Sequence, residues 1–146
     1  MNFFTTTSFR SAIQQLTRKP KNGYMSVVLD ICETLKSMPD NILRDTNDRI
    51  RQEQYFRMVK LRIGNSNQNL PKNDGFRLIY WVSIKSDNLV LLTIYPKRGP
   101  LAAANLTDAE FVRLLREMVE ENKNQMLQQV DIASSLRVIK VQCGLH

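Results

Sequence analysis

Two stretches in the middle of the chain place cations within otherwise apolar segments. In MVKLRI, residues 58–63, Lys60 and Arg62 alternate with aliphatic residues. This period of two predicts a strand whose cations share one face while its aliphatic side chains share the other. In GFRLIYWV, residues 75–82, Arg77 interrupts a run that is typical of a buried strand. Because a guanidinium keeps its charge and is costly to bury unpaired, we expect Arg77 to face a functional surface beside Lys60 and Arg62.

Aromatic and further basic residues accompany these three cations. Trp81 falls on the same strand face as Arg77, and YPKRG places Tyr95, Lys97 and Arg98 at the end of the next predicted strand. Cations contact phosphates while aromatic rings stack on bases, so this composition is typical of an RNA-binding surface. The alternative is that each cation protects an edge strand from aggregation. Three cations on one face, with two more at a strand end, favour the functional interpretation.

The net charge of +7 is concentrated in the same third of the chain. Residues 51–100 hold nine Lys and Arg against three Asp and Glu. The first fifty residues hold seven against five, and residues 101–146 hold five against six. A focused basic region favours a polyanionic partner.

Residue types that are scarce in the chain restrict its chemistry. The only histidine is His146, and the two cysteines, Cys32 and Cys143, are far apart in the sequence. We therefore expect reduced thiols, no metal site, no cofactor and no catalysis through imidazole. The start of the chain does not read as a secretory signal, and no apolar run approaches the ~20 residues that span a membrane. These features predict a cytoplasmic protein with no membrane partner.

The remaining pattern predicts an α+β fold, with a small antiparallel sheet and helices packed mainly on one face. Residues 24–38 repeat apolar positions at three and four, which predicts an amphipathic helix, and Thr107 with Glu110 forms a capping box before another helix. Residues 40–54 are polar and predict a helix end followed by a loop. The predicted order is a strand near the N-terminus, helices at 8–19 and 24–38, strands at 58–63, 75–84 and 89–95, a helix at 106–122 and a strand-like stretch at 136–141.

The element order and one long stretch resemble the RelE/ParE superfamily of bacterial type II toxins, especially its RelE and HigB branches. The stretch contains FRMVKLRIG, DGFRLIYWVSIKSDNLVLLTIYPKRG and LTDAEFVRLL. The resemblance implies a RelE-like toxin domain at residues 1–121 and a helical or mixed extension at 122–146. It also implies a metal-independent mRNA endoribonuclease that acts on the translating ribosome, inhibits translation and is neutralised by a cognate antitoxin.

The resemblance also implies roles for particular residues. The family's strand lysine falls on Lys60, its partner two residues on falls on Arg62, and the strand arginine falls on Arg77. In RelE the second of these positions is also lysine, so this chain departs from the family there. The basic residue after the third strand falls on Lys97 or Arg98.

Cleavage of RNA without a metal requires a base for the 2′-hydroxyl, cations around the phosphorane and an acid for the 5′-oxygen. The late catalytic tyrosine of RelE has no match, because no tyrosine follows Tyr95. Tyr95 could take its place if the geometry allows. We assign Lys60 as the base, Arg62 and Arg77 as stabilising cations, and Tyr95, Lys97 or Arg98 as the acid or a phosphate contact, with Trp81 as an RNA contact.

Two other functions compete with the nuclease at this point. One is a ParE-like, non-enzymatic inhibitor of a DNA topoisomerase, which shares the fold but usually lacks the full set of cations. The other is a nucleic-acid-binding module without toxicity. The combination of Lys60, Arg62 and Arg77 favours the nuclease.

Overall fold

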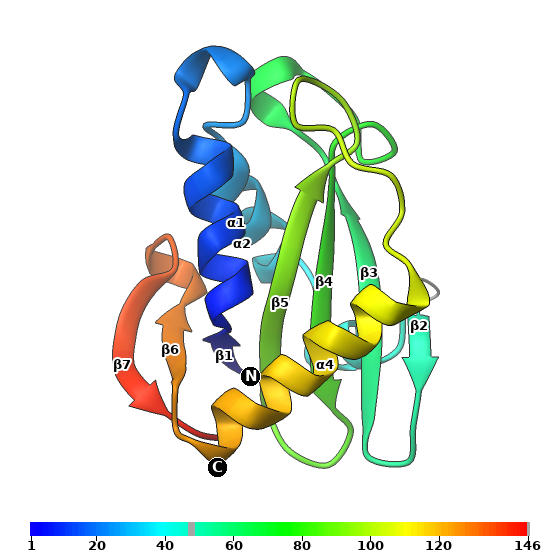
Figure 1. Cartoon of the computed structure of the whole chain (residues 1–146), viewed down its shortest axis with the longest axis vertical. Helices are drawn as coiled ribbons and strands as arrows, with labels where there is room; N and C mark the ends of the chain where they lie inside the picture. Colours follow the sequence, from blue (N-terminus) through cyan, green and yellow to red (C-terminus); the bar gives the residue numbers. More distant parts are fainter. Residues whose placement is uncertain (47–48, 146) are drawn as a thin grey trace.

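A computed structural model describes residues 1–46 and 49–145 and confirms the α+β class. Seven strands in the described residues form one sheet in the order β2-β3-β4-β5-β1-β6-β7 (Figure 1). The strands are β1 (Asn2–Thr5), β2 (Arg49–Gln52), β3 (Phe56–Ile63), β4 (Phe76–Ser83), β5 (Asn88–Pro96), β6 (Leu127–Asp131) and β7 (Arg137–Cys143). The α-helices are α1 (Thr7–Thr17), α2 (Val27–Lys36), α3 (Asp40–Arg44) and α4 (Asp108–Lys123).

The centre of the sheet is the antiparallel meander β3-β4-β5 that the alternating pattern predicts. β1 lies beside β5 and runs parallel to it. After β1 the chain continues into α1 and α2. All other strand pairs are antiparallel. The Ser83 hydroxyl shapes the turn between β4 and β5 by accepting hydrogen bonds from the backbone N–H groups of Lys85 and Ser86.

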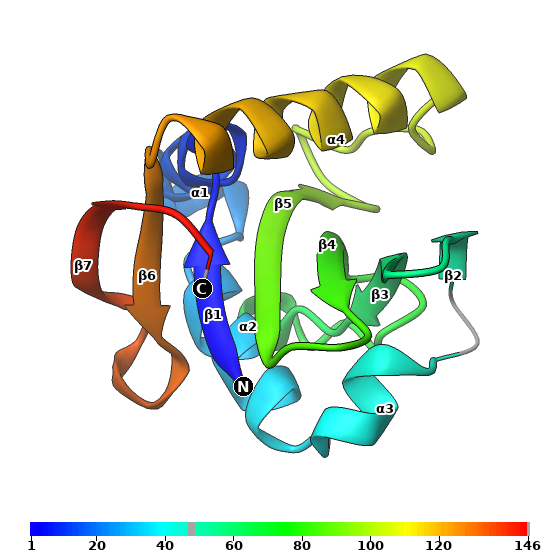
Figure 2. The same cartoon turned by 90° about the horizontal axis from the view of Figure 1, so that it is seen from below.

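The two faces of the sheet carry two separate apolar clusters, and helices cover both. Leu78 and Tyr80 of β4 pack in the first cluster, which α1, α2 and α3 cover. Ile79 of the same strand packs in the second cluster, against Leu114 and Met118 of α4. Figure 2 shows α4 and α3 on opposite sides of the sheet. The prediction of helices mainly on one face is therefore confirmed only in part: α1, α2 and α3 share one face, but α4 covers the other, because both side-chain sets of β4 are largely apolar and both need a cover.

β2 and β6 lie where the sequence predicted no strand. β2 falls within the polar segment 40–54, and its neighbours at 47 and 48 lie outside the described residues. β6 pairs with β1, and β7 pairs with β6, so the predicted extension at 122–146 continues the same sheet. The capping box of α4 is confirmed, with the Thr107 hydroxyl accepting from the Glu110 N–H. No helix among the described residues is both long and apolar enough to cross a membrane.

Candidate functional site

Three of the predicted catalytic residues form one row across β3, β4 and β5 at one end of these strands. Arg62 of β3 lies opposite Arg77 of β4, and Arg77 lies opposite Tyr95 of β5. Lys60 lies opposite Ile79, two residues further along the same face. This face is the one that α4 partly covers, because Tyr95 and Ile79 both belong to the second cluster. The strand pairing thus brings the four predicted residues to one face of the sheet; the alternating pattern predicts this for Lys60, Arg62 and Arg77, and the pairing of β4 with β5 adds Tyr95.

Arg77 is buried, with 6% of its surface exposed, and its guanidinium binds the backbone of the turn that precedes β4. Its Nη1 donates to the carbonyl oxygens of Lys72 at 3.0 Å and Phe76 at 3.2 Å, and its Nη2 donates to that of Asn73 at 2.8 Å. These bonds repay the desolvation of the cation. The interruption of the apolar strand by Arg77 therefore has a structural cause besides any contact with a partner.

Tyr95 is also buried, with 8% of its surface exposed. Its hydroxyl has no hydrogen-bond partner within residues 1–46 and 49–145. Burial raises the pKa of this hydroxyl above its ordinary value, while the nearby Arg77 cation lowers it, as does the Leu106 backbone, which lies near the hydroxyl but outside hydrogen-bonding geometry. The phenol is consequently protonated at neutral pH. An unsatisfied buried hydroxyl is uncommon and calls for a structural or functional reason.

The two predicted site cations on β3, Lys60 and Arg62, are more accessible than Arg77. Arg62 is exposed and makes one long hydrogen bond, of 3.3 Å, to the Asn73 side-chain oxygen. Lys60 is half-buried. Since long basic side chains extend beyond their own strand, Lys60 and Arg62 are the predicted residues of this face that can contact a solvent-borne anion directly.

The cations after β5 lie at the same end of the sheet as the row. Lys97 and Arg98 are exposed. The Lys97 N–H donates to the Gly75 carbonyl at 2.8 Å, which fixes the chain beside the start of β4. Arg98 forms an exposed ion pair with Asp74 at 2.8 Å. Exposed pairs of this kind contribute little to stability and exchange easily for another anion.

Trp81 lies away from the row. It is four residues from Arg77 along β4, about 13 Å at the strand rise of ~3.3 Å per residue. Its ring is half-buried in the second cluster and stacks on Phe56, with ring centroids 5.9 Å apart. The strand register puts Trp81 on the predicted face, but the structure does not bring it together with Arg62 and Tyr95.

A polar hollow at the same end of the sheet was not predicted from the sequence. It has a volume of about 310 Å³ and is lined in part by Lys21, Tyr24, Asn65 and Arg98. The Tyr24 hydroxyl donates to the Arg98 carbonyl at 2.8 Å, and the Asn65 amide donates to the Gly23 carbonyl at 2.9 Å. These bonds join three connecting segments that are far apart in the sequence. In the sequence alone, the basic residues of these segments are the only feature that could have indicated the hollow.

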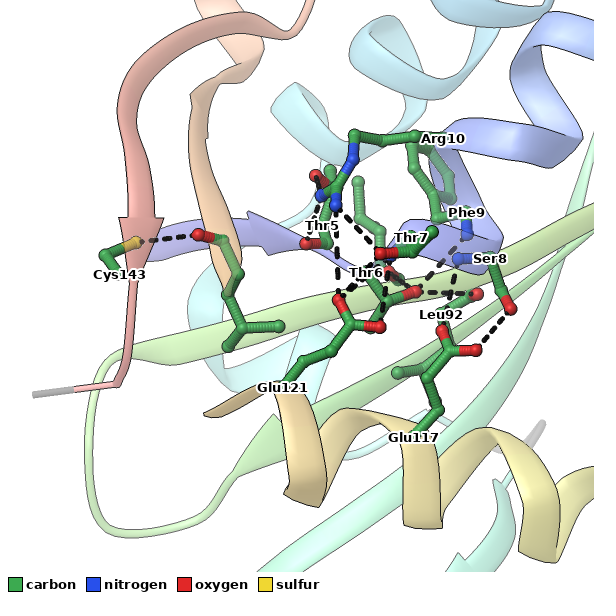
Figure 3. A network of polar contacts seen from close by, with 12 residues as sticks. Thr5, Thr6, Thr7, Ser8, Phe9, Arg10, Leu92, Glu117, Glu121 and Cys143 are labelled. Atoms are coloured by element: carbon green, nitrogen blue, oxygen red, sulfur yellow. Dashed lines mark hydrogen bonds and ion pairs between the residues drawn. The ribbon is translucent and has the colours of Figure 1, made fainter. Parts of the chain in front are cut away.

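A second polar cluster connects α1 to α4, the helix that covers part of the candidate face (Figure 3). Glu121 accepts from the Thr7 N–H at 3.1 Å, and Glu117 accepts from the Ser8 N–H at 3.1 Å and the Ser8 hydroxyl at 2.6 Å. Arg10 lies 4.0 Å from Glu121. Carboxylates at a helix N-terminus satisfy free N–H groups and interact well with the helix dipole, so this cluster attaches α4 to α1.

Burial and the neighbouring carboxyl group affect the protonation of this cluster. Burial raises the pKa of Glu121 above its ordinary value, the bonds from Thr7 lower it, and the proximity of Glu117 raises it further. Since both glutamates already bind the start of α1, we regard the cluster as part of the scaffold.

Comparison with known proteins gives one distant similarity. The chain is 24% identical over 113 residues to Immune-associated nucleotide-binding protein 3 of Arabidopsis thaliana. The match covers 77% of this chain and 32% of that protein, so the chain spans about a third of its length. No family model matches the sequence, and no solved structure matches the fold at a significant level.

Proposed function

We propose that the chain is an RNA-binding toxin of the RelE/ParE type that cleaves mRNA without a metal ion. The observation that supports this proposal is the row of Arg62, Arg77 and Tyr95, with Lys60 on the same face. These residue types supply cations for a phosphate, an amine that can act as a base and a protonated phenol that can act as an acid. Exposed Lys97 and Arg98 extend the basic surface at the end of β5.

In the proposed reaction the 2′-oxygen of the RNA attacks the adjacent phosphorus. The amine of Lys60 takes the 2′-hydroxyl proton, and Arg62 with Arg77 neutralises the phosphorane charge. The bond from phosphorus to the 5′-oxygen then breaks, and the Tyr95 hydroxyl gives its proton to that oxygen. The products are a 2′,3′-cyclic phosphate and a 5′-hydroxyl. The strand spacings put Lys60 and Tyr95 on the order of 12 Å apart at Cα, which leaves room for a phosphodiester between their side chains.

The burial of Arg77 and Tyr95 supports a dependence on the ribosome. In the isolated chain both groups are covered, so only Lys60 and Arg62 meet an incoming RNA. A second large partner can supply the orientation that this site lacks, and orientation alone can contribute ~7–11 kcal/mol to a barrier. The proposal includes a cytoplasmic location, mRNA on the ribosome as substrate and a cognate antitoxin as protein partner.

A second candidate function is RNA binding without cleavage. It is favoured by the internal use of the Arg77 guanidinium, whose donors bind the carbonyl groups of Lys72, Asn73 and Phe76. If these bonds persist in the complex, the row lacks its central cation. Inhibition of a topoisomerase has no such observation in its favour. The name of the Arabidopsis protein refers to nucleotide binding, but this sequence contains no G-x-x-x-x-G-K-[ST] phosphate-binding loop.

The decisive experiment changes Lys60. This residue is assigned as the base, and its substitution does not break the hydrogen bonds by which Arg77 holds the turn before β4. We expect Lys60→Met to reduce mRNA cleavage on purified ribosomes by about 10²–10⁴-fold, the contribution of one acid–base group. Binding to RNA should fall much less, and the wild-type product should carry a 2′,3′-cyclic phosphate end.

Lys85→Met provides the matched control, because Lys85 lies in the β4–β5 turn over the Tyr55 ring, away from the row. The control should cleave as the wild type does. Undiminished cleavage by Lys60→Met would remove Lys60 from the mechanism. Tight RNA binding with no cleavage by the wild type would favour the second candidate function.

A further inference from the structure

The edge strand β7 exposes more apolar surface than an edge normally does. Val138, Ile139 and Val141 are 43%, 58% and 60% exposed, and they lie close together on the strand that ends the sheet. In Figure 1 this strand forms the margin of the molecule beside β6. β7 pairs with β6 alone among the described strands. Its outer edge therefore presents backbone N–H and C=O groups that another strand can bind.

The charge of this region indicates what kind of strand fits it. Arg137 and Lys140 are both exposed on β7. No Asp or Glu occurs anywhere after Asp131 in the sequence, and the whole chain carries a net charge of +7. A strand with acidic side chains would gain from both cations, whereas a basic strand would be repelled.

A second copy of this chain is a poor occupant by the same reasoning. Two β7 strands side by side would bring four cations together without a single acidic residue, between two molecules that are each strongly basic. Like charges on neighbouring strands are destabilising. Self-association through β7 is thus disfavoured by charge although the apolar residues alone would permit it.

An apolar hollow next to β7 provides space for side chains of the added strand. It has a volume of about 300 Å³ and lies between β7 and the first two helices, with Ile13, Val28, Leu136 and Val138 among its lining residues. In strand addition the backbone supplies affinity and hollows for alternate side chains supply specificity. A strand paired with β7 can direct every second side chain towards this side of the sheet.

We propose that β7 is a docking edge for an extended segment of a partner protein in which apolar and acidic residues alternate. The segment adds one strand to the sheet beyond β7. Its acidic side chains lie near Arg137 and Lys140, and its apolar side chains cover Val138, Ile139 and Val141. This inference rests on the surface of β7 alone and is independent of the proposed nuclease site.

The test uses two labelled synthetic peptides, one of alternating valine and glutamate and one of alternating valine and lysine. Fluorescence anisotropy at low salt should show the glutamate peptide binding the full chain at least about tenfold more tightly than the lysine peptide, a preference that weakens as salt screens the charges. Hydrogen exchange in the complex should show new protection confined to the amides of β7.

Two variants locate the binding. The double substitution Ile139→Ser with Val141→Ser should weaken binding of the glutamate peptide about tenfold, and Lys140→Glu should abolish the preference between the peptides. The matched control is Val112→Ser with Val119→Ser, which changes two exposed aliphatic residues of α4 and should leave binding unchanged.

Three results would overturn the proposal. The first is equal affinity for the two peptides, and the second is exchange protection outside β7. The third is a concentration-dependent dimer of the wild type, seen by sedimentation and lost in the Ile139→Ser, Val141→Ser variant, because a second copy would then occupy the edge.

Discussion

The two faces of the central sheet are built from the same strands but differ in what they bury. On the first face β4 contributes Leu78 and Tyr80 to a cluster under three helices, and the Tyr80 hydroxyl donates to the Leu43 carbonyl at 2.7 Å. On the second face α4 covers Ile79, but the row of Arg62, Arg77 and Tyr95 continues past the apolar cluster. The first face is mainly apolar and its buried Tyr80 hydroxyl is satisfied, although two buried guanidinium nitrogens of Arg57 on that face have no partner among the described residues. The second face combines apolar packing with a row of polar groups at one end.

This difference shows what a strand pattern can and cannot say about a site. Both faces of β4 are largely apolar and must be covered by other parts of the chain. On the second face the cover is α4 at one end of the strand and a turn of the chain at the other end, beside Arg77. The turn satisfies the guanidinium but leaves the Tyr95 hydroxyl without a partner in the described part of the chain. Each face thus holds one residue with buried polar atoms that lack a partner in the described part of the chain, Arg57 on the first and Tyr95 on the second, but only on the second face does such a residue lie beside other predicted site residues.

The largest expected effect on the second face comes from Arg77→Met. The substitution leaves the carbonyl groups of Lys72, Asn73 and Phe76 without this donor, and we expect the free energy of unfolding to fall by about 2–3 kcal/mol. Arg62→Met, on the neighbouring strand, should change it by no more than about 0.5 kcal/mol because Arg62 is exposed. Urea denaturation of both variants measures the contrast.

Equal stability of the two variants would mean that the turn does not depend on Arg77, and the two cations would then be equivalent surface groups. A loss of activity in Arg77→Met alone cannot separate catalysis from folding. The activity of this variant is informative only at temperatures where denaturation curves show it to be fully folded.

A smaller effect of opposite sign is expected from Tyr95→Phe. The substitution removes a buried hydroxyl that has no partner among the described residues, so the variant should be as stable as the wild type or more stable by up to about 1 kcal/mol. If the proposed mechanism holds, mRNA cleavage should fall while stability does not. Thermal denaturation and a cleavage assay together test both parts, and Tyr24→Phe offers the contrast of a hydroxyl with two hydrogen bonds.

A loss of stability in Tyr95→Phe comparable to that in Tyr24→Phe would show that the Tyr95 hydroxyl is satisfied in solution. The Tyr95 hydroxyl of the second face would then match the bonded Tyr80 hydroxyl of the first. The comparison between the faces would in that case rest on Arg77 alone.

Much of the fold follows from local patterns in the sequence. The alternation around Lys60 and Arg62 predicts β3 and its two faces, and Thr107 with Glu110 predicts the start of α4. β6 is harder to predict, because its place in the sheet depends on β1, more than a hundred residues away, and the strand-like stretch that became β7 has its place fixed only by pairing with β6. The side of the sheet that a helix covers is likewise a tertiary property, which is why the position of α4 was not foreseen.

The candidate site was only partly predictable for a similar reason. Strand parity correctly places Lys60, Arg62 and Arg77 on one face, since parity needs only residue spacing and antiparallel pairing. The burial of Arg77 depends on the path of the turn through Lys72 and Asn73, which no periodic signal encodes. Trp81 has the right parity but lies at the wrong end, because parity fixes a face and not a position along it.

The smallest effect concerns the attachment of α4 over the second face, through Glu121. Its pKa in the folded chain is raised above its ordinary value near 4.5, chiefly by burial, so the folded state holds the proton more tightly than the unfolded state. The stabilisation that comes from this proton is present in acid and is lost as pH rises through the raised pKa. Glutamine cannot titrate but can still accept from the Thr7 N–H.

The stability of Glu121→Gln relative to the wild type should therefore increase as pH rises from about 4.5 towards neutral. Denaturation curves at several pH values measure this difference. Glu120→Gln is the matched control, because Glu120 is exposed on the same helix, and its difference from the wild type should stay nearly constant. An equally flat difference for Glu121→Gln would mean that the carboxyl group is solvated in solution. The contact between α4 and α1 would then be looser than in Figure 3, and the second face more open than the first.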